Sequence, residues 1–337
     1  MARPVGVFRL LISRPLVWIS GDESVAFQPN QPVQIIGIDI GGTKCAVSVL
    51  RGGAVVEVDR FPTLDFPATF ARYLDAIVRL KPGPDVVFGI SCGGPLNAAR
   101  GLILNPPNLP GWVNTEICRA FTDAFGGRAF LMNDANASAL AEWHFGAGKG
   151  CKHMIFLTAG TGMGAGFILN GRLYEGATGD AGEVGHLRLR PDGPMGFGKR
   201  GSFEGFCSGG GIARLAAEMG WKQAGASLKD IAESATQGDV LALRVLDTAG
   251  ERLGEALALL IDTLNPERIV LGGYYPRCSE LLLPAMKRAL AAEALPSALA
   301  GCRILPAVLG ETIGSNAAVA VALHGLDRLP EHVRAAP

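Results

Sequence analysis

The chain carries one pattern twice: a short apolar strand pattern that runs into a glycine-rich turn and continues as a second strand. The first copy is Gln34–Ile40 followed by Gly41–Lys44, and the second is Met154–Thr158 followed by Ala159–Gly164. Internal similarity of this kind indicates a duplicated architecture. Because glycines let the backbone approach a phosphate group closely, the two copies predict a duplicated α/β fold that closes on a nucleotide between its halves.

The spacing of apolar residues predicts the remaining elements. In the first half we expect strands at Cys45–Leu50, Ala54–Asp59, Asp85–Ser91 and Ala129–Met132, and helices at Pro67–Leu80 and Ala135–Phe145. In the second half we expect strands at Ala165–Leu169, Arg172–Tyr174 and, last, Arg268–Leu271, and helices at Gly211–Met219, Leu228–Ala235, Asp239–Leu264 and Thr312–His324. Ser227 and Asp230 have the spacing of a capping box. The closing helix consists mainly of small residues, which favours close packing against the first half.

The length of 337 residues exceeds what one hydrophobic core usually serves, so two domains are expected. We place a small α/β lobe at residues 35–137, completed by the closing helix at 312–325, and a large α/β lobe at 138–311. Residues 1–34 are an extension whose order the sequence does not determine. Its apolar part contains Arg9 and Arg14, and no small-residue cleavage site follows, which does not fit a secretory signal.

Charge and cysteine usage narrow the class of partner. The chain has 31 basic and 31 acidic residues, and a net charge of zero offers no nucleic-acid surface. No apolar run approaches the roughly 18 residues of a membrane span. The seven cysteines contain no CxxC pair, which fits a reducing cytoplasm and argues against disulfides. A small polar ligand is therefore the expected partner, rather than nucleic acid or membrane.

Asp39 stands near the end of the first strand, beside the turn Gly41–Lys44. Backbone N–H groups in such a turn can hold phosphate oxygens, while the carboxylate orients a hydrated Mg²⁺. An ordinary tight hairpin is the alternative. The second turn, Ala159–Gly164, leads into a strand rather than a helix, so it does not fit a dinucleotide-binding fingerprint, although a plain hairpin stays open.

Further polar residues gather at element ends. Asn133 and Asp134 follow a short strand and precede a helix. That place suits a catalytic carboxylate, but Asn and Asp are also favoured as helix N-caps, and both interpretations stay open. Glu183, His186 and Glu204 can form a polar pocket, a metal site or a surface loop, since an isolated E-x-x-H pattern decides little.

Taken in their order, these motifs resemble those of the ROK family (repressors, open reading frames, kinases). Gly37–Lys44 is similar to the family's first phosphate motif, Gly160–Gly164 to its second, Asn133–Ala137 to its catalytic motif with Glu142–Gly148 as the sequel, and Gly182–His186 to its sugar-binding E-x-G-H. The resemblance runs from about Ile35 to Leu323. It implies the duplicated actin-like ATPase (ribonuclease H-like) fold, with two lobes around a nucleotide cleft.

The resemblance also implies an ATP-dependent kinase that transfers the γ-phosphate to a hexose hydroxyl, usually the one on carbon 6, with Asp134 as general base. The residues implied to bind the sugar are Asn108, Asn133, Asp134, Glu183, His186 and Glu204. Those implied to bind the nucleotide and its phosphates are Asp39, Gly41, Gly42, Thr43, Lys44, Gly160, Thr161, Gly162, Gly272 and Gly273. ATP and Mg²⁺, the latter held by Asp39 through water, are the implied cofactors, and we expect a homodimer or a tetramer.

One stretch departs from the family, most of whose members bind a structural zinc ion through the counterpart of His186 and three cysteines. Here Met195, Phe197 and Ser202 occupy the cysteine positions, and Cys207 is too distant to rebuild a tetrahedral site. We therefore expect no structural zinc. Apolar packing by Met195 and Phe197 is expected in its place, which leaves His186 to serve only the sugar.

Other functions fit parts of the sequence. The family includes sugar-responsive transcriptional regulators, but these carry an N-terminal winged helix-turn-helix, and the extension here is too short and lacks a recognition-helix pattern. A chaperone-like ATPase would give no reason for Glu183 and His186. The prediction is a sugar kinase, and a ROK-type regulator or a non-catalytic sugar-binding relative is the alternative. The sequence does not identify the sugar, which can be glucose, a related hexose or an N-acetylhexosamine.

Overall fold

The computed structural model describes residues 33–221 and 225–328. The predicted extension at residues 1–34 therefore lies outside the described residues, apart from its last two positions. Within the described ranges, no helix combines the length and the apolar character that crossing a membrane requires.

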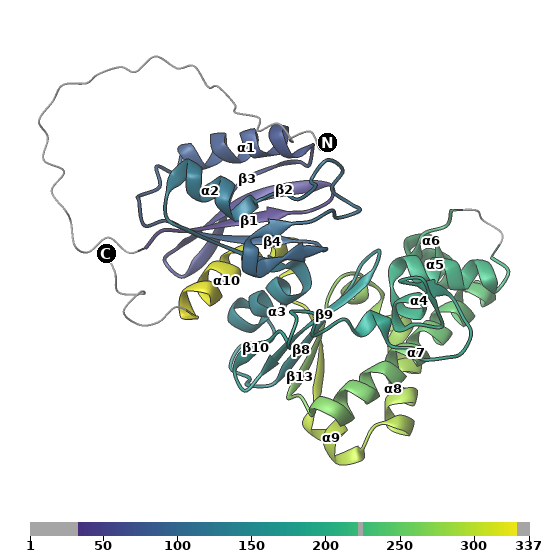
Figure 1. Cartoon of the computed structure of the whole chain (residues 1–337). Helices are drawn as coiled ribbons and strands as arrows, with labels where there is room; N and C mark the ends of the chain where they lie inside the picture. The colour runs from purple at the N-terminus through teal and green to yellow at the C-terminus, as the bar shows by residue number, and fades with distance from the viewer. Residues whose placement is uncertain (1–32, 222–224, 329–337) are drawn as a thin grey trace, which may run out of the picture. The chain divides into compact units, whose positions relative to one another are not determined.

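The first half of the chain folds around a five-stranded sheet in the order β3-β2-β1-β4-β7 (Figure 1). Its strands are β1 (Ile35–Ile40), β2 (Lys44–Arg51), β3 (Ala54–Pro62), β4 (Val87–Cys92) and β7 (Arg128–Asn133). The three consecutive strands β1, β2 and β3 pair antiparallel as predicted, and β4 and β7 run parallel to β1. Helices α1 (Phe66–Val78) and α2 (Ile117–Phe125) pack on one face of this sheet.

The second sheet repeats this connectivity, in the order β10-β9-β8-β13-β14. Its strands are β8 (Met154–Ala159), β9 (Met163–Leu169), β10 (Arg172–Tyr174), β13 (Arg268–Leu271) and β14 (Arg303–Pro306). In both sheets the central strand pairs antiparallel on one side and parallel on the other, and each of these neighbours pairs in the same sense with the edge strand beyond it, so the predicted duplication is confirmed. The expectation that Arg268–Leu271 is the last strand is wrong, because β14 extends the sheet at its edge.

Helices α3 (Asp134–Phe145) and α10 (Ile313–Asp327) pack against each other, α10 on the first sheet and α3 on the second. The approach of α10 to the first sheet is close. A Cβ atom at Gly89 in β4 would overlap the backbone of Ala318 and Ala322, so only glycine fits there. The prediction that small residues let the closing helix pack closely is thus confirmed.

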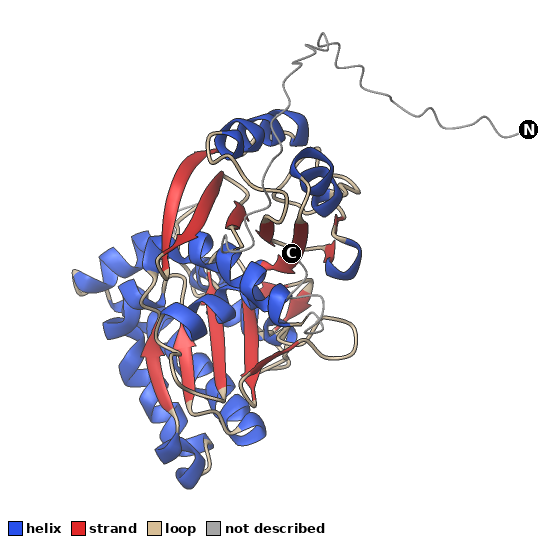
Figure 2. Ribbon diagram, turned by 90° about the vertical axis from the view of Figure 1, so that its left-hand side faces the viewer, coloured by secondary structure: helices blue, strands red, loops and turns tan. Residues whose placement is uncertain are grey.

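Strands β8 and β13 of the second sheet are buried on both faces, as expected for strands with parallel neighbours. Ile155 and Leu157 of β8 pack toward α7 (Val240–Leu264) and α8 (Tyr275–Glu293), whereas Phe156 packs toward α3. Figure 2 shows helices flanking the strands. The remaining helices are α4 (Phe203–Cys207), α5 (Gly209–Glu218), α6 (Leu228–Thr236) and α9 (Pro296–Gly301). The predicted capping box of Ser227 and Asp230 is present at α6.

Short elements connect these layers and carry much of the site. They are β5 (Leu96–Asn97), η1 (Ala98–Arg100), β6 (Leu102–Ile103), η2 (Val184–His186), β11 (Met195–Gly196), β12 (Lys199–Arg200) and η3 (Gly310–Thr312).

Candidate active site

The predicted general base, Asp134, and the predicted Mg²⁺-orienting residue, Asp39, lie where parallel strands of the first sheet end. Ile40 of β1 pairs in register with Cys92 of β4, and Cys92 pairs with Asn133 of β7. The carboxyl ends of parallel strands lie at one edge of a sheet, the usual place for ligand sites in α/β folds. Asp39, one residue before the end of β1, and Asp134, one residue after β7, are thereby brought to the same edge.

Asn133 serves as the N-cap of α3, since its side-chain oxygen accepts a hydrogen bond from the Ala135 N–H at 2.9 Å. The capping interpretation is therefore correct for Asn133 and leaves Asp134 as the first helical residue. The turn after β4 faces the same pair. A Cβ atom built on Gly93 would lie 3.6 Å from Asp134 Oδ2, and one on Gly94 would lie 3.7 Å from Asn133 Nδ2.

The two carboxylates share an environment that disfavours negative charge. Burial, with a further contribution from the nearby Asp134 charge, raises the pKa of Asp39 from 3.8 to about 7. Desolvation also raises the pKa of Asp134, partly opposed by backbone N–H groups at the start of α3. Asp134 is nevertheless open to solvent, so a ligand can reach it. A carboxylate with a raised pKa that is also accessible is suited to proton transfer.

The first glycine-rich turn lies beside Asp39. Gly41 N–H donates to Lys44 O at 3.1 Å, and the Thr63 hydroxyl donates to Gly41 O at 2.6 Å, which fixes the turn. Asn108 packs directly against Gly42, where a Cβ atom would lie 2.9 Å from the Asn108 Cβ. The loop that carries Asn108 is anchored by the fully buried Trp112, whose Nε1–H donates to Leu64 O at 3.0 Å.

An ion pair links this turn to the end of the second half of the chain. Lys44 Nζ lies 3.5 Å from Glu311 Oε2 in η3, and Arg277 of α8 lies 3.9 Å from the same carboxylate. All three side chains are more than half exposed. Thr43, between Gly42 and Lys44, accepts the Thr63 N–H through its carbonyl at 3.1 Å.

The second turn, Gly160 to Gly162, lies at the N-terminus of α5. Gly209 N–H donates to Gly160 O at 2.8 Å, and Gly160 N–H donates to Gly162 O at 2.9 Å. The start of α5 is thereby held against the turn, and helix N-termini favour anions. Gly272 and Gly273, which follow β13, lie against the end of β8: Gly273 has φ +68°, and Tyr274 N–H donates to Ala159 O at 2.8 Å. The predicted nucleotide residues of the second half thus lie together.

Glu204 in α4 connects this turn to the predicted sugar residues. Its Oε2 accepts the Met163 N–H at 3.1 Å, directly after the turn, and its Oε1 accepts the Phe197 N–H at 3.1 Å. Both carboxylate oxygens therefore carry a backbone hydrogen bond, and the side chain is largely buried. Sequence patterns did not reveal this bridging role, because the partners are backbone groups distant in sequence.

Glu183 precedes η2 and His186 ends it, and both side chains are open to solvent. Desolvation raises the pKa of Glu183, His186 opposes this, and the negative charges of Asp180, Asp134 and Glu204 add to it. Because the charge of Asp134 is among the causes of this shift, Glu183, a residue of the second half, lies near Asp134 of the first half. The structure thus brings Asp39, Asp134, Glu183, His186 and Glu204 into one region.

The three positions that correspond to zinc ligands are used differently. Ser202 is the N-cap of α4, with its hydroxyl accepting the Gly205 N–H at 3.1 Å and donating to Gly196 O at 3.2 Å. The Phe197 ring stacks on His186, with ring centroids 4.1 Å apart and planes at 26°. Packing is thus seen for Phe197, whereas Met195 is 40% exposed. A thioether, a ring and a capping hydroxyl do not fit a zinc site. Among the described residues, no group of three or more His, Cys, Asp or Glu side chains is arranged to hold a metal.

Two contacts near the site were not expected from sequence. In the first contact, Gly314 of α10 lies so close to Asp39 that a Cβ atom on it would overlap the Asp39 carboxylate. Glycine at this position is required for Asp39 to keep its place, and no local pattern reveals that need. The second is the stacking of Phe197 on His186. The sequence indicated apolar packing at Phe197 but not its partner.

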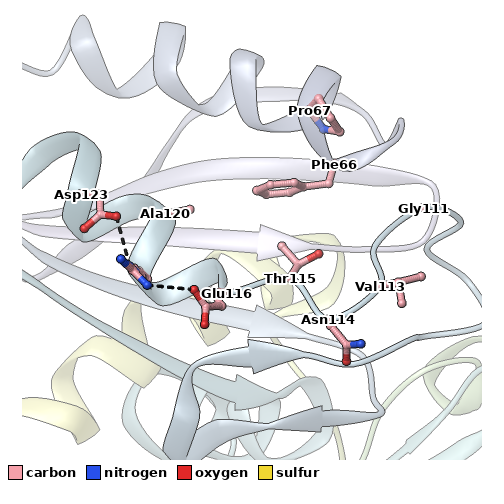
Figure 3. A pocket seen from close by; sticks show the side chains of 10 residues that line it. Phe66, Pro67, Gly111, Val113, Asn114, Thr115, Glu116, Ala120 and Asp123 are labelled. Carbon is pink, nitrogen blue, oxygen red and sulfur yellow. Dashed lines mark hydrogen bonds and ion pairs between the residues drawn. The ribbon is translucent and has the colours of Figure 1, made fainter. Parts of the chain in front are cut away.

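A hollow of about 540 Å³ on the described surface lies elsewhere. It is open and lies between the start of α1 and the start of α2 (Figure 3). Arg119 in its wall is ion-paired with Glu116 and Asp123, at 3.3 and 3.4 Å. None of the sequence-predicted site residues lines it.

Comparison with known proteins places this geometry in context. The family model described as "ROK family" matches residues 35–324. The chain is 31% identical to a glucokinase of Thermotoga maritima, over 86% of this chain and 97% of that protein, and 31% identical to an N-acetylmannosamine kinase of Citrobacter koseri, over 71% and 82%. It also resembles the solved structure of a ROK family glucokinase from Streptomyces griseus in complex with glucose and AMPPNP, with a TM-score of 0.68, 29% identity and coverage of 87% and 100%. The predicted actin-like fold is thereby confirmed.

Proposed function

Because the chain belongs to the ROK family, we propose that it is an ATP-dependent sugar kinase that transfers the γ-phosphate to a hexose hydroxyl, with the 6-hydroxyl as the expected acceptor. The single observation that carries this proposal is the position of Asp134: accessible to a ligand, with a raised pKa, and electrostatically coupled to both Asp39 and Glu183. The names of relatives support the reaction class, and the AMPPNP complex of one solved relative supports ATP as donor.

In the proposed reaction, Asp134 accepts the proton from the attacking sugar hydroxyl as its oxygen bonds to the γ-phosphorus of ATP. The bond from the γ-phosphorus to the β,γ-bridging oxygen breaks, and ADP leaves with that oxygen. General bases work best when their pKa is near the operating pH, and desolvation moves Asp134 in that direction. Asn108, Asn133, Glu183, His186 and Glu204 are proposed to orient the sugar. Glu204 is the special case, since its two oxygens already accept backbone N–H groups and have only their remaining lone pairs for a hydroxyl.

Phosphoryl transfer depends mainly on positioning and on neutralising charge. We assign the phosphates to the two glycine-rich turns and the adenosine to Gly272 and Gly273. Mg²⁺ fits this site, because it is usually bound through one or two carboxylates, waters and substrate phosphates rather than by a full protein cage. Asp39 would hold it through water, and Mg²⁺ would neutralise charge on the phosphates. As part of the same proposal, residues 35–137 with 312–325 form one lobe and 138–311 the other, in a cytoplasmic homodimer or tetramer.

The alternative functions receive less support. A likeness to a ROK transcriptional regulator exists, with a TM-score of 0.74, but at 24% identity it concerns the fold alone. A regulator that only binds sugar gives no reason for a desolvated, accessible carboxylate at the end of β7.

A coupled assay of ADP release over a panel of sugars tests the proposal. Glucose, mannose, fructose, allose, N-acetylglucosamine and N-acetylmannosamine are each supplied with ATP and Mg²⁺. We expect turnover with at least one of them that depends on both ATP and Mg²⁺. Saturable sugar binding by calorimetry without any turnover would favour the non-catalytic alternative.

A further inference from the structure

The hairpin formed by β11 and β12 holds η2 by two separate contacts. At its tip the Phe197 ring stacks on the His186 imidazole, with ring centroids 4.1 Å apart and planes at 26°. On its second strand, Lys199 Nζ donates a hydrogen bond to the His186 carbonyl at 2.7 Å. The side chain and the backbone of His186 are therefore both fixed from the same hairpin.

The backbone of Phe197 fixes a second predicted sugar residue. Its N–H donates to Glu204 Oε1 at 3.1 Å, while Glu204 Oε2 accepts the Met163 N–H at 3.1 Å beside the second glycine-rich turn. Phe197 therefore contacts His186 through its ring and Glu204 through its backbone. Phe197 therefore lies between the residues predicted to bind the sugar and the turn predicted to bind the phosphates.

The conformation of Phe197 indicates that the ring matters. The residue has φ +49°, a left-handed conformation that is unfavourable for a bulky side chain, and it is followed by Gly198 at φ +66°. Phe197 as a whole is also 52% exposed, so burial of apolar surface is a weak reason for a phenylalanine here. A position that demands positive φ normally favours glycine or asparagine. Among the described residues, the ring lies against η2, on His186 and beside Gly185, where a Cβ atom would lie 3.4 Å from Phe197 Cε2.

From these contacts we infer that Phe197 is a positioning residue of the sugar site: its ring sets the orientation of the His186 imidazole. The inference rests on the proposed function for its catalytic consequence, but the stacking itself does not. A phenyl ring above an imidazole limits rotation of the imidazole about χ2. The directions in which its two nitrogens can form hydrogen bonds are thereby fixed. His186 can then meet a sugar hydroxyl without losing side-chain freedom on binding.

Three variants separate the ring from the hairpin. Phe197→Ala removes the ring, Phe197→Tyr keeps it, and Met195→Ala removes an exposed side chain from the same hairpin as a matched control. We expect Phe197→Ala to raise the KM for the sugar about 2- to 10-fold, the range that an aromatic pair contact contributes. The KM for ATP should stay within about twofold, and Phe197→Tyr and Met195→Ala should behave as the unsubstituted chain.

A second measurement needs no activity. The ring protons of His186 are assigned in NMR spectra by comparison with His186→Gln. In the ligand-free chain and in Phe197→Tyr they should show an upfield ring-current shift. In Phe197→Ala this shift should be lost. Absence of the shift in the unsubstituted chain overturns the stacking. A shift that is lost in Phe197→Ala while the sugar KM stays unchanged overturns the positioning role. If the unsubstituted chain phosphorylates no sugar, the proposed function fails, and the NMR result still decides whether Phe197 orients His186. Should Phe197→Ala not fold, Phe197→Leu replaces it, because leucine keeps apolar bulk without a ring.

Discussion

The two glycine-rich turns are copies of one structural unit, but the carboxylates beside them are held in opposite ways. At the first turn, burial raises the pKa of both Asp39 and Asp134, and the charge of Asp134 adds to the rise for Asp39, whose pKa reaches about 7. At the second turn, Glu204 is largely buried but accepts backbone N–H groups at both oxygens. The two halves therefore share the glycine-rich turn, but they differ in how the neighbouring carboxylate is hydrogen-bonded and charged.

The difference suggests a division of labour between the halves. Carboxylates whose charge is poorly compensated are suited to take up protons or a cation, since bringing in either relieves the cost of ionisation. A carboxylate satisfied by backbone donors is poorly suited to take up a proton. It holds loops together and has only its remaining lone pairs for a sugar hydroxyl. On this view the first half carries the reaction, and the second half supplies a rigid frame for the phosphates and the sugar.

The strongest test of this division is removal of the proposed base. Asp134→Asn should lower turnover about 10²-fold or more, because general base catalysis contributes about 10²- to 10⁴-fold. Sugar binding should survive, since the amide still reaches the hydroxyl. Steady-state kinetics and calorimetry on the same samples measure the two effects. Asp85→Asn, a change at an exposed position beyond the site, is the matched control. Turnover of Asp134→Asn within threefold of that control would remove Asp134 from the mechanism.

A second test concerns the ionisation of Asp39 without any ligand. Its pKa of about 7 in the folded chain lies above the ordinary value of 3.8. Between these values the folded state holds a proton that the unfolded state releases, so this group makes the free energy of unfolding fall as pH rises from about 4 to 7. Above pH 7 the destabilisation caused by the buried Asp39 charge is fully present, and at acid pH it is absent.

The free energy of unfolding of Asp39→Asn, relative to that of the unsubstituted chain, should therefore be higher at pH 8 than at pH 5. We expect about 1–3 kcal/mol, given about 1.4 kcal/mol for each pKa unit. Urea unfolding at both pH values in Mg²⁺-free buffer measures it. Because other titrating groups are common to both proteins, the difference isolates Asp39. Parallel stability curves for the two proteins would show that burial does not penalise this charge.

A third test addresses the second half. Glu183→Ala should lower kcat/KM for the sugar about 5- to 150-fold, since leaving one buried hydroxyl partner unsatisfied costs about 1–3 kcal/mol. The KM for ATP should hardly change. Glu293→Ala, at the exposed end of α8, controls for loss of a glutamate. A loss of ATP affinity instead of sugar affinity would transfer Glu183 from the sugar to the nucleotide.

Much of the frame, including both turns, could be predicted from the sequence, because local patterns determine it. The elements that were missed lack such signals. Helix α2 has no side-chain cap at Glu116, and α8 contains Pro284 in its interior, which argues against a helix. Strand β14 is a short, partly exposed edge strand that ends in Pro306.

The candidate site could be predicted as a set of residues but not as an arrangement. The motifs gave Asp134, Glu183 and Glu204, yet the sequence could not tell which carboxylates are left without compensation. That depends on backbone groups and on burial contributed by distant segments, such as Gly314 behind Asp39. Tertiary contacts of this kind have no local periodicity, so they become visible only in the fold.

The smallest expected effect is the response of the second half to a chelator. In the hairpin that carries Phe197, the loop is held by stacking on His186, by the Ser202 cap and by the Glu204 bridge. None of these contacts requires a metal ion, and the side chains at the three ligand positions lack the thiolates that zinc favours. We therefore expect far less than one zinc ion per chain by elemental analysis.

A strong chelator should then leave the melting temperature unchanged once Mg²⁺ is resupplied. The comparison is sharpened by Phe197→Ala, which should lower the melting temperature while leaving the response to chelator at zero, because the ring rather than a metal supports the loop. Zinc that is present at one ion per chain, survives dialysis and leaves only on unfolding would contradict this account. It would mean that His186 is held by a metal ligand set that the described arrangement does not contain, and that the second half is stabilised by coordination rather than by packing.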